Sequence, residues 1–431
     1  MAGKKAGQFR HNHYVPEWYQ KRFLMPGETR FHHLDLAPEK ITVATAKGPK
    51  TYSRNEVHEW GPDMCFAEED LYTTNWAGTA NTDIEQFFFG DIDDKGRKAA
   101  ELFSAFEYDH PGINEGFHHL LRYMSVQKLR TPKGLAFLSA VARTNNKALN
   151  LLLLQRIQSM HCAIWTECIW QIADCSQSPT KLIISDHPVT VYNRECFPMS
   201  RYCSGSQDPD IRFVATHTYF PLSLDKLLIF TNKSWLRDPY QNALAVRPNP
   251  DLFRGAMFSW LDIQTGRKLT EDEVLKVNYI TKKRAYRYIA AGKREWLYPE
   301  RRMKHDHWRK FGDGLLLMPE PRHHHMGGEI IIGYKDGSSD AFGPYGHKPW
   351  QKGYKDGNRE ARESSSLERF KAEWAAKHGP RYTAVDWGFG ASRDNPPRSS
   401  DSKDFHQHYL EEDAVNLKRP GERARRRRLK E

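Results

Sequence analysis

A carboxylate at the end of an apolar run is the first feature of the sequence that could take part in a reaction. Asp186 follows the run Leu182–Ile184 and stands two residues before Pro188. A carboxylate at the end of a strand is a common position for a metal ligand or a general base. Asp and Pro are also favoured in turns, where the Asp side chain caps its own backbone. Both roles remain open for Asp186 at this stage.

A histidine near the start of the chain is a second candidate for chemistry. His13 opens the segment His13-Tyr14-Val15-Pro16, which leads into the amphipathic run 18–23. The ordinary pKa of histidine lies near neutrality, so His13 could accept or donate a proton in a reaction. The alternative is a histidine that caps or packs within the core. The sequence therefore offers His13 as an acid–base group with a structural alternative.

Two predicted helices place polar side chains within their apolar stripes. At 100° per residue, Gln127 lies 20° from Leu120 in the stripe of helix 113–130, and Asn278 lies within the stripe of helix 271–291. Arg287 lies off the second stripe. A buried amide without partners costs about 1–3 kcal/mol. Each amide therefore belongs to a satisfied polar network or lines a cleft.

The elements that must position these residues indicate an α+β fold. A helical pattern covers 83–106 and is expected to be interrupted at Gly90, Asp91 and Gly96, and further helical patterns cover 113–130, 134–173 and 271–291. β-branched runs at 182–193, 213–223 and 226–232 are typical of strands of one antiparallel sheet. We expect a helix-rich core packed against this sheet in a core domain of residues 1–298. Residues 299–431 are expected to form an accessory, largely flexible basic region with a short strand at 329–334 and a helix at 364–378.

The charge of the chain is positive and is concentrated at its end. Lys+Arg number 65 against 54 for Asp+Glu, which gives a net charge of +11. Residues 418–431 hold eight basic and two acidic residues, including Arg425, Arg426, Arg427 and Arg428. Such a run can bind a phosphate backbone. It can equally be a solvated tail, and both interpretations stay open.

Cysteine content and hydropathy restrict the class of protein. Six cysteines in 431 residues, with no Cys-x-x-Cys pair, do not indicate a disulfide scaffold or a zinc finger. No stretch approaches 18 consecutive apolar residues, and no secretory signal is visible at the N-terminus. We therefore expect a protein of the reducing cytoplasm without a membrane partner.

Five short motifs occur in a fixed order along residues 10–292. They read HYVPEWYQKRF (13–23), QKLRTP (127–132), ISDHPV (184–189), FPLSLD (220–225) and N-x6-A-Y-R-Y (278–288). The set resembles the domain-of-unknown-function 4238 family of mostly bacterial proteins. The family pattern has Asn where this chain has His187, and Leu where it has Gln20. The positions that match the motifs are His13, Tyr14, Pro16, Gln127, Arg130, Pro132, Ser185, Asp186 and Pro188.

The resemblance implies a site and a broad functional class. Family members resemble proteins of mobile or defence-related bacterial neighbourhoods, which favours nucleic-acid chemistry over metabolism. The leading hypothesis is a metal-dependent, nuclease-like phosphodiester hydrolase using Mg²⁺ or Mn²⁺. Asp186 with His187 or Glu85 would hold the metal. The catalytic candidates are His13, Asp186, Gln127 and Arg130, and the binding candidates are Tyr14, Ser185, Asn278, Arg287 and Arg425–Arg428.

A second hypothesis requires no reaction. In a non-catalytic protein that binds nucleic acid or a nucleotide, the same Gln, Arg, Asp and His side chains would form a polar core that only satisfies itself. The basic end run would then hold the nucleic acid. A metabolic enzyme is not favoured, because neither a glycine-rich phosphate loop after a strand nor a nucleophile elbow occurs in the sequence.

Overall fold

The computed structural model describes most of residues 11–379. The residues in this range that it does not describe are 47, 77–78, 82–83, 204–207, 249–257, 259–261, 323, 325, 327–329 and 334–335. The chain divides into two compact units, one of residues 1–233 and 242–319 and one of residues 234–241 and 320–431. Antiparallel sheets packed against helices make the fold α+β, as the sequence predicts. No helix among the described residues is long and apolar enough to cross a membrane.

The central sheet of the first unit has four antiparallel strands. Its order is β11-β12-β13-β9, with the bounds Thr190–Tyr192, His217–Pro221, Lys226–Asn232 and Cys168–Asp174. The predicted antiparallel pairing of residues 213–223 with 226–232 is confirmed. Nearly every residue of these strands is buried, so both faces of the sheet are covered.

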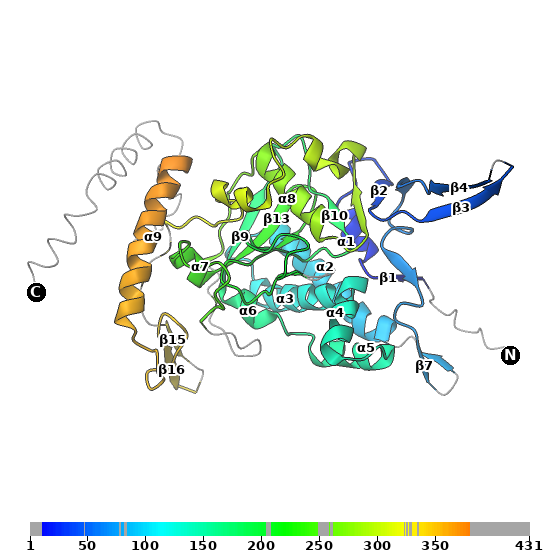
Figure 1. Cartoon of the computed structure of the whole chain (residues 1–431). Helices are drawn as coiled ribbons and strands as arrows, with labels where there is room; N and C mark the ends of the chain where they lie inside the picture. The colour runs from blue at the N-terminus through cyan, green and yellow to red at the C-terminus, as the bar shows by residue number, and fades with distance from the viewer. Residues whose placement is uncertain are drawn as a thin grey trace, which may run out of the picture. The chain divides into compact units, whose positions relative to one another are not determined.

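Helices cover the two faces of this sheet. Trp170 and its cross-strand neighbour Phe230 share one face, because directly paired residues point the same way. The Trp170 ring packs there against Phe117 and Phe103 of two neighbouring helices. On the opposite face, the Tyr219 hydroxyl donates to the Val277 carbonyl of a third helix. Figure 1 shows these helices, which are α2 (Gly90–Ser104), α3 (Ile113–Arg130) and α8 (Glu271–Arg284).

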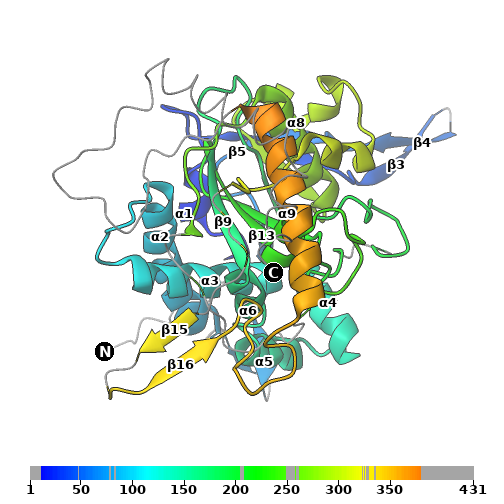
Figure 2. The ribbon, with the colours of Figure 1, turned by 90° about the vertical axis from the view of Figure 1, so that its left-hand side faces the viewer.

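A second sheet joins segments that are far apart in the chain. Its order is β10-β14-β2-β5, with the bounds Ile184–Ser185, Tyr288–Ala291, Phe31–Asp35 and Val57–Trp60. The predicted strand 182–193 is thus split between two sheets, since the Asp-His-Pro turn separates β10 from β11. Figure 2 shows β5 beyond the strands β9 and β13 of the central sheet.

The predicted helix 134–173 is wrong. The segment forms α4 (Pro132–Ala142), α5 (Lys147–Arg156), α6 (Cys162–Thr166) and then strand β9. Arg143 ends α4 in the left-handed conformation, with φ of 51°. The Asn146 side chain then caps the start of α5. Residues 168–174 pair with β13 because their β-branched and aromatic side chains are buried in the sheet.

Two other helix predictions also had wrong limits. The helix expected over 83–106 is a π-helix, η1 (Ile84–Phe89), that continues into α2 without a break at Gly90 or Gly96. The helix expected over 271–291 ends at Arg284, and its last residues form β14. The predicted capping box of Thr270 and Glu273 is present at its start.

The remaining elements of the first unit are short. They are α1 (Glu17–Lys21), the paired strands β1 (His11–His13) and β6 (Ala67–Glu69), β3 (Lys40–Thr45) and β4 (Gly48–Ser53), β7 (Thr74–Trp76) and β8 (Thr79–Asn81), and the 3-10 helices η3 (Arg294–Leu297), η4 (Pro299–Arg301) and η5 (Trp308–Gly314). Helix α7 (Lys233–Arg237) begins at the last residue before the break, and the rest of it belongs to the second unit.

Between residues 330 and 378, the described part of the second unit forms a small hairpin and a long helix. The hairpin pairs β15 (Ile330–Gly333) with β16 (Ser339–Phe342). Helix α9 (Gly357–His378) begins earlier than the predicted 364 and buries Leu367, Phe370 and Trp374. Arg425 to Arg428 of the predicted phosphate-binding run lie outside the described residues.

Candidate functional site

The carboxylate of Asp186 is buried and bound by the backbone of the chain itself. Its Oδ1 accepts from the Tyr286 N–H at 2.8 Å, and its Oδ2 accepts from Arg287 at 2.6 Å and Tyr288 at 2.8 Å. Burial raises the pKa of Asp186 to about 6, although the three N–H donors lower it in part. These three hydrogen bonds therefore hold the turn after β10 against the start of β14.

The neighbours of Asp186 are also engaged. The Ser185 hydroxyl accepts from the His187 N–H at 3.2 Å. The Nδ1 atom of His187 lies 2.7 Å from the Thr131 hydroxyl, and its Nε2 lies 3.2 Å from an Asp208 carboxylate oxygen. Burial lowers the pKa of His187 to about 3, so this ring is neutral at neutral pH. Both ring nitrogens thus have partners within the protein.

Gln127 and Arg130 form the network that the helical wheel indicates. The Gln127 amide donates to the Tyr14 carbonyl at 2.8 Å, and its Oε1 accepts from Arg130 Nε at 2.8 Å. Arg130 also pairs with Asp93 at 2.8 Å. The side chains of Gln127 and Arg130 are fully buried. The first motif is therefore joined to the second through the Tyr14 backbone.

His13 lies in a different environment from the other predicted catalytic residues. It is half-buried in β1, and its Nε2 lies 3.1 Å from the carbonyl oxygens of Pro62 and Asp63. Burial lowers the pKa of His13. The Tyr14 side chain, in contrast, is buried, and its pKa is raised by that burial and by the nearby charge of Asp186. Thus Tyr14, not His13, lies close enough to Asp186 for their charges to interact.

The predicted binding residues have structural partners as well. Asn278 accepts from the Ile183 N–H at 3.2 Å and donates to the Lys181 carbonyl at 2.9 Å. Arg287 binds Asp35 through two hydrogen bonds of 3.0 and 2.8 Å. Asn278 therefore binds α8 to the residues just before β10. Arg287 binds the start of β14 to Asp35 at the end of β2.

Three charged side chains that the sequence did not predict, those of Lys128, Lys133 and Asp208, lie next to His187. We call these three residues and His187 the buried lysine cluster. The two lysine ammonium groups lie 2.6 and 2.5 Å from the Asp208 carboxylate, and the three side chains are only 8–14% exposed. Asp208 is 80 residues from Lys128 and follows no periodic pattern, so no signal in the sequence could have paired them.

Two of the three predicted metal ligands, Asp186 and His187, already have partners within the protein. Among the side chains that the structure describes, no group of three or more His, Cys, Asp or Glu residues could hold a metal ion. The oxygens of Asp186 accept from backbone N–H groups, and both nitrogens of His187 have partners. Glu85 lies in η1, and its side chain is outside the described residues. Binding of Mg²⁺ or Mn²⁺ stays a prediction.

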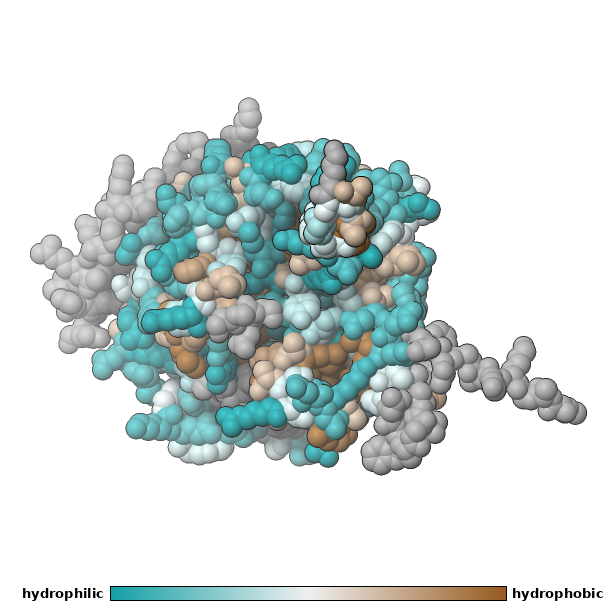
Figure 3. All heavy atoms as spheres, turned by 45° about the vertical axis from the view of Figure 1, so that its right-hand side comes forward, coloured by the Kyte–Doolittle hydropathy of each residue, from teal (hydrophilic) through white to brown (hydrophobic). Residues whose placement is uncertain are grey.

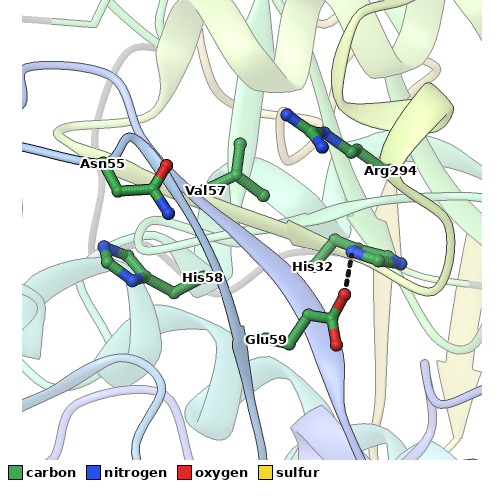
Figure 4. A pocket seen from close by; sticks show the side chains of 6 residues that line it. All are labelled: His32, Asn55, Val57, His58, Glu59 and Arg294. Carbon is green, nitrogen blue, oxygen red and sulfur yellow. Dashed lines mark ion pairs between the residues drawn. The ribbon is translucent and has the colours of Figure 1, made fainter.

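A separate polar hollow of about 380 Å³ lies beside β2 and β5. Figure 4 shows its lining, in which His32 and Glu59 approach each other from neighbouring strands. Their Nδ1 and Oε1 atoms are 3.7 Å apart. The lining residues are His32, Asn55, Val57, His58, Glu59 and Arg294. None of these belongs to the predicted site.

Comparisons with known proteins add no further constraint. No family model matches the chain, and no similar curated protein or solved structure was found. The resemblance to the domain-of-unknown-function 4238 family therefore stays a prediction from the ordered motifs.

Proposed function

We propose that the protein binds nucleic acid and that the residues predicted to be catalytic build its fold instead. The three backbone N–H groups that bind the buried Asp186 carboxylate carry this proposal. A general base or a metal ligand needs a lone pair that a proton or an ion can reach. The two oxygens of Asp186 are buried and already accept short hydrogen bonds. The carboxylate therefore holds the turn after β10 against the start of β14.

The charge of the chain supports nucleic acid as the partner. The net charge is +11, and residues 418–431 contribute +6 of it. A cationic segment neutralises phosphates and releases counterions, which gives affinity without sequence preference. The excess of cations is suited to binding phosphates, and the buried polar side chains stabilise the fold.

Binding assays at several salt concentrations test this proposal. We would measure dissociation constants of the whole chain for single- and double-stranded DNA and RNA, and repeat them after deletion of residues 418–431. The logarithm of affinity should fall with the logarithm of salt by about 0.9 per neutralised phosphate. We expect the deletion to reduce this slope by several units. Absence of binding to every nucleic acid at low salt would overturn the proposal.

A nuclease assay on the same samples tests the alternative of a hydrolase. We expect all substrates to stay intact with Mg²⁺ or Mn²⁺, and Asp186→Asn to lower the free energy of unfolding by about 1–3 kcal/mol because an amide N–H₂ would face a backbone donor. Metal-dependent cleavage by the wild type, lost in an Asp186→Asn variant that still folds, would instead establish phosphodiester hydrolysis.

A further inference from the structure

The hairpin of β3 and β4 has no core of its own. We call residues 39–54 the β3–β4 ribbon; it is inserted between β2 and β5, which pair with each other. Every residue of both strands is exposed. Among the described residues, β3 and β4 pair only with each other. Figure 1 shows the ribbon extending away from the sheet that contains β2.

The two faces of the β3–β4 ribbon differ in chemistry. The cross-strand pairs Ile41–Tyr52 and Val43–Lys50 share one face, and the pair Thr42–Thr51 lies on the other. Ile41, Val43 and Tyr52 are 36%, 48% and 48% exposed. The Lys50 ammonium lies 5.3 Å from the centre of the Tyr52 ring. One face thus carries apolar side chains and Lys50, while the other carries small polar side chains and Lys40, which pairs with Ser53.

The β3–β4 ribbon gathers three exposed large apolar side chains, Ile41, Val43 and Tyr52, on one face. Hydrophilic residues cover most of the face in Figure 3, and apolar residues form small separate patches there. An isolated two-stranded hairpin is marginally stable in water. The exposed aliphatic and aromatic side chains of the β3–β4 ribbon therefore indicate a surface that a partner covers.

The charge of the β3–β4 ribbon indicates a polyanion as that partner. Residues 39–54 contain four basic residues and one acidic residue, and the basic residue Lys47 lies outside the described residues. The acidic residue, Glu39, pairs with Arg54 at 3.3 Å. Neither Lys40 nor Lys50 forms an ion pair with another described residue. Both ammonium groups are available to phosphates.

We propose that the β3–β4 ribbon enters the major groove of double-stranded DNA, which rests on the proposed nucleic-acid binding. Paired strands lie about 4.8 Å apart and rise about 3.3 Å per residue, so six residues span about 20 Å. The major groove of B-form DNA is about 12 Å wide and 8.5 Å deep and admits such a ribbon. Lys50 contacts guanine edges on the face where Ile41 and Val43 pack against thymine methyl groups, and Lys40, on the other face, contacts the phosphate backbone.

The same geometry excludes double-stranded RNA from this contact. The major groove of A-form RNA is deep and too narrow for side chains to read. A duplex RNA of the same sequence is therefore the control ligand. Its binding depends on the rest of the chain and is independent of the apolar face of the ribbon.

Charge-matched double variants of the full chain test the inference. Lys40→Gln with Lys50→Gln should weaken binding to a mixed-sequence DNA duplex about tenfold and reduce the salt slope by about 2. The control, Arg97→Gln with Lys98→Gln, removes the same charge from exposed positions of α2 and should change the affinity less than about twofold. All four side chains are exposed, so thermal unfolding should be unchanged.

An uncharged variant tests the groove contact itself. Ile41→Ser with Val43→Ser should weaken duplex DNA binding about fivefold, with an unchanged salt slope, because apolar burial is lost and no charge changes. Binding to the RNA duplex should stay the same.

Four outcomes distinguish the two proposals. If the wild type binds no nucleic acid, the proposed function fails before any variant is made. If the wild type binds DNA but the ribbon variants equal the α2 control, the inference fails and the function stands. Equal loss of RNA binding in the Ile41→Ser, Val43→Ser variant would overturn the groove assignment. Ribbon-dependent binding to phosphatidylserine vesicles without ribbon-dependent DNA binding would overturn it as well.

Discussion

At the scale of single residues, Asp208 has the clearest energetic role. It accepts from the ammonium groups of Lys128 and Lys133 inside the protein. Two lysines without a buried counter-charge would carry an uncompensated desolvation cost. We expect Asp208→Asn to lower the free energy of unfolding by about 3–5 kcal/mol, as measured by urea denaturation.

Asp210→Asn is the matched control for this substitution. Asp210 pairs with Arg212 at 2.7 Å, but the two side chains are 31% and 45% exposed. Because exposed pairs contribute about 0–1 kcal/mol, the loss should be small. Equal losses from the two variants would show that the buried lysine cluster does not stabilise the fold.

The sequence could predict burial at this scale but not the partners. The helical wheel placed Gln127 and Asn278 on apolar faces and required either a network or a cleft. Both amides are in networks, and the acceptor of the Gln127 amide, the Tyr14 carbonyl, is 113 residues away in the chain. A periodic pattern contains no information on such a distant atom. The role of Asp186 depended in the same way on backbone donors about 100 residues away.

At the scale of elements, the junction of α3 and α4 depends on Gly134. A side-chain carbon at this position would lie within 3 Å of the carbonyl oxygens of Lys128 and Leu129. Helix propensity alone would make Gly134→Ala stabilising by about 1 kcal/mol. Since backbone cannot move aside as a side chain can, we expect a loss of about 1–3 kcal/mol in thermal unfolding instead.

Gly116→Ala provides the comparison on α3. The added carbon would meet a methyl group of Leu102 at 3.2 Å, and this flexible side chain can move. The loss should therefore be smaller than at Gly134. A stabilised Gly134→Ala protein would contradict the close approach of the two helices.

Element limits were predictable where the local signal was strong. The stripe and the Thr-Pro stop gave α3 its observed bounds, and the capping box gave the start of α8. The segment 134–173 is rich in apolar residues along its whole length, with Leu up to residue 154 and Trp165 and Trp170 later, so local pattern did not separate its helices from β9. Pairing with β13 decides the conformation of β9, and that pairing is a tertiary interaction.

At the scale of the whole molecule, buried histidines should make stability depend on pH. Burial lowers the pKa of His33 to about 4 and those of His161, His187 and His217 to about 3. The unfolded chain binds these protons near pH 6.5 while the folded protein does not. Their stabilising contribution is complete above pH 6.5 and is lost as the pH falls toward 3–4.

The slope of this loss can be measured by urea denaturation at pH 7, 6 and 5. Four histidines contribute about 5 kcal/mol per pH unit, and Asp186, whose pKa is raised to about 6, opposes them by about 1. We expect a net loss of about 4 kcal/mol per unit between pH 6 and 5. Equal stability at pH 7 and 5 would show that these rings are not held neutral by burial.

The limit between the two units was not visible in the composition. The sequence suggested a core domain of residues 1–298, whereas the first unit continues to residue 319 and leaves 234–241 to the second. Trp308, Phe311 and Leu316 are buried in the core of the first unit. These apolar residues lie in a segment rich in charged residues. Its average composition therefore did not indicate that part of it is buried in the core.

The position of β2 in its sheet has a consequence for synthesis on the ribosome. β2 pairs with β5 soon after it emerges, but its other neighbour is β14, and the Asp35–Arg287 bond of this edge joins residues 252 apart. At about 5–20 residues per second, translation takes roughly 10–50 s to supply β14. During that interval the nascent chain presents an open strand edge to its neighbours, which is a template for aggregation until the later half of the polypeptide arrives.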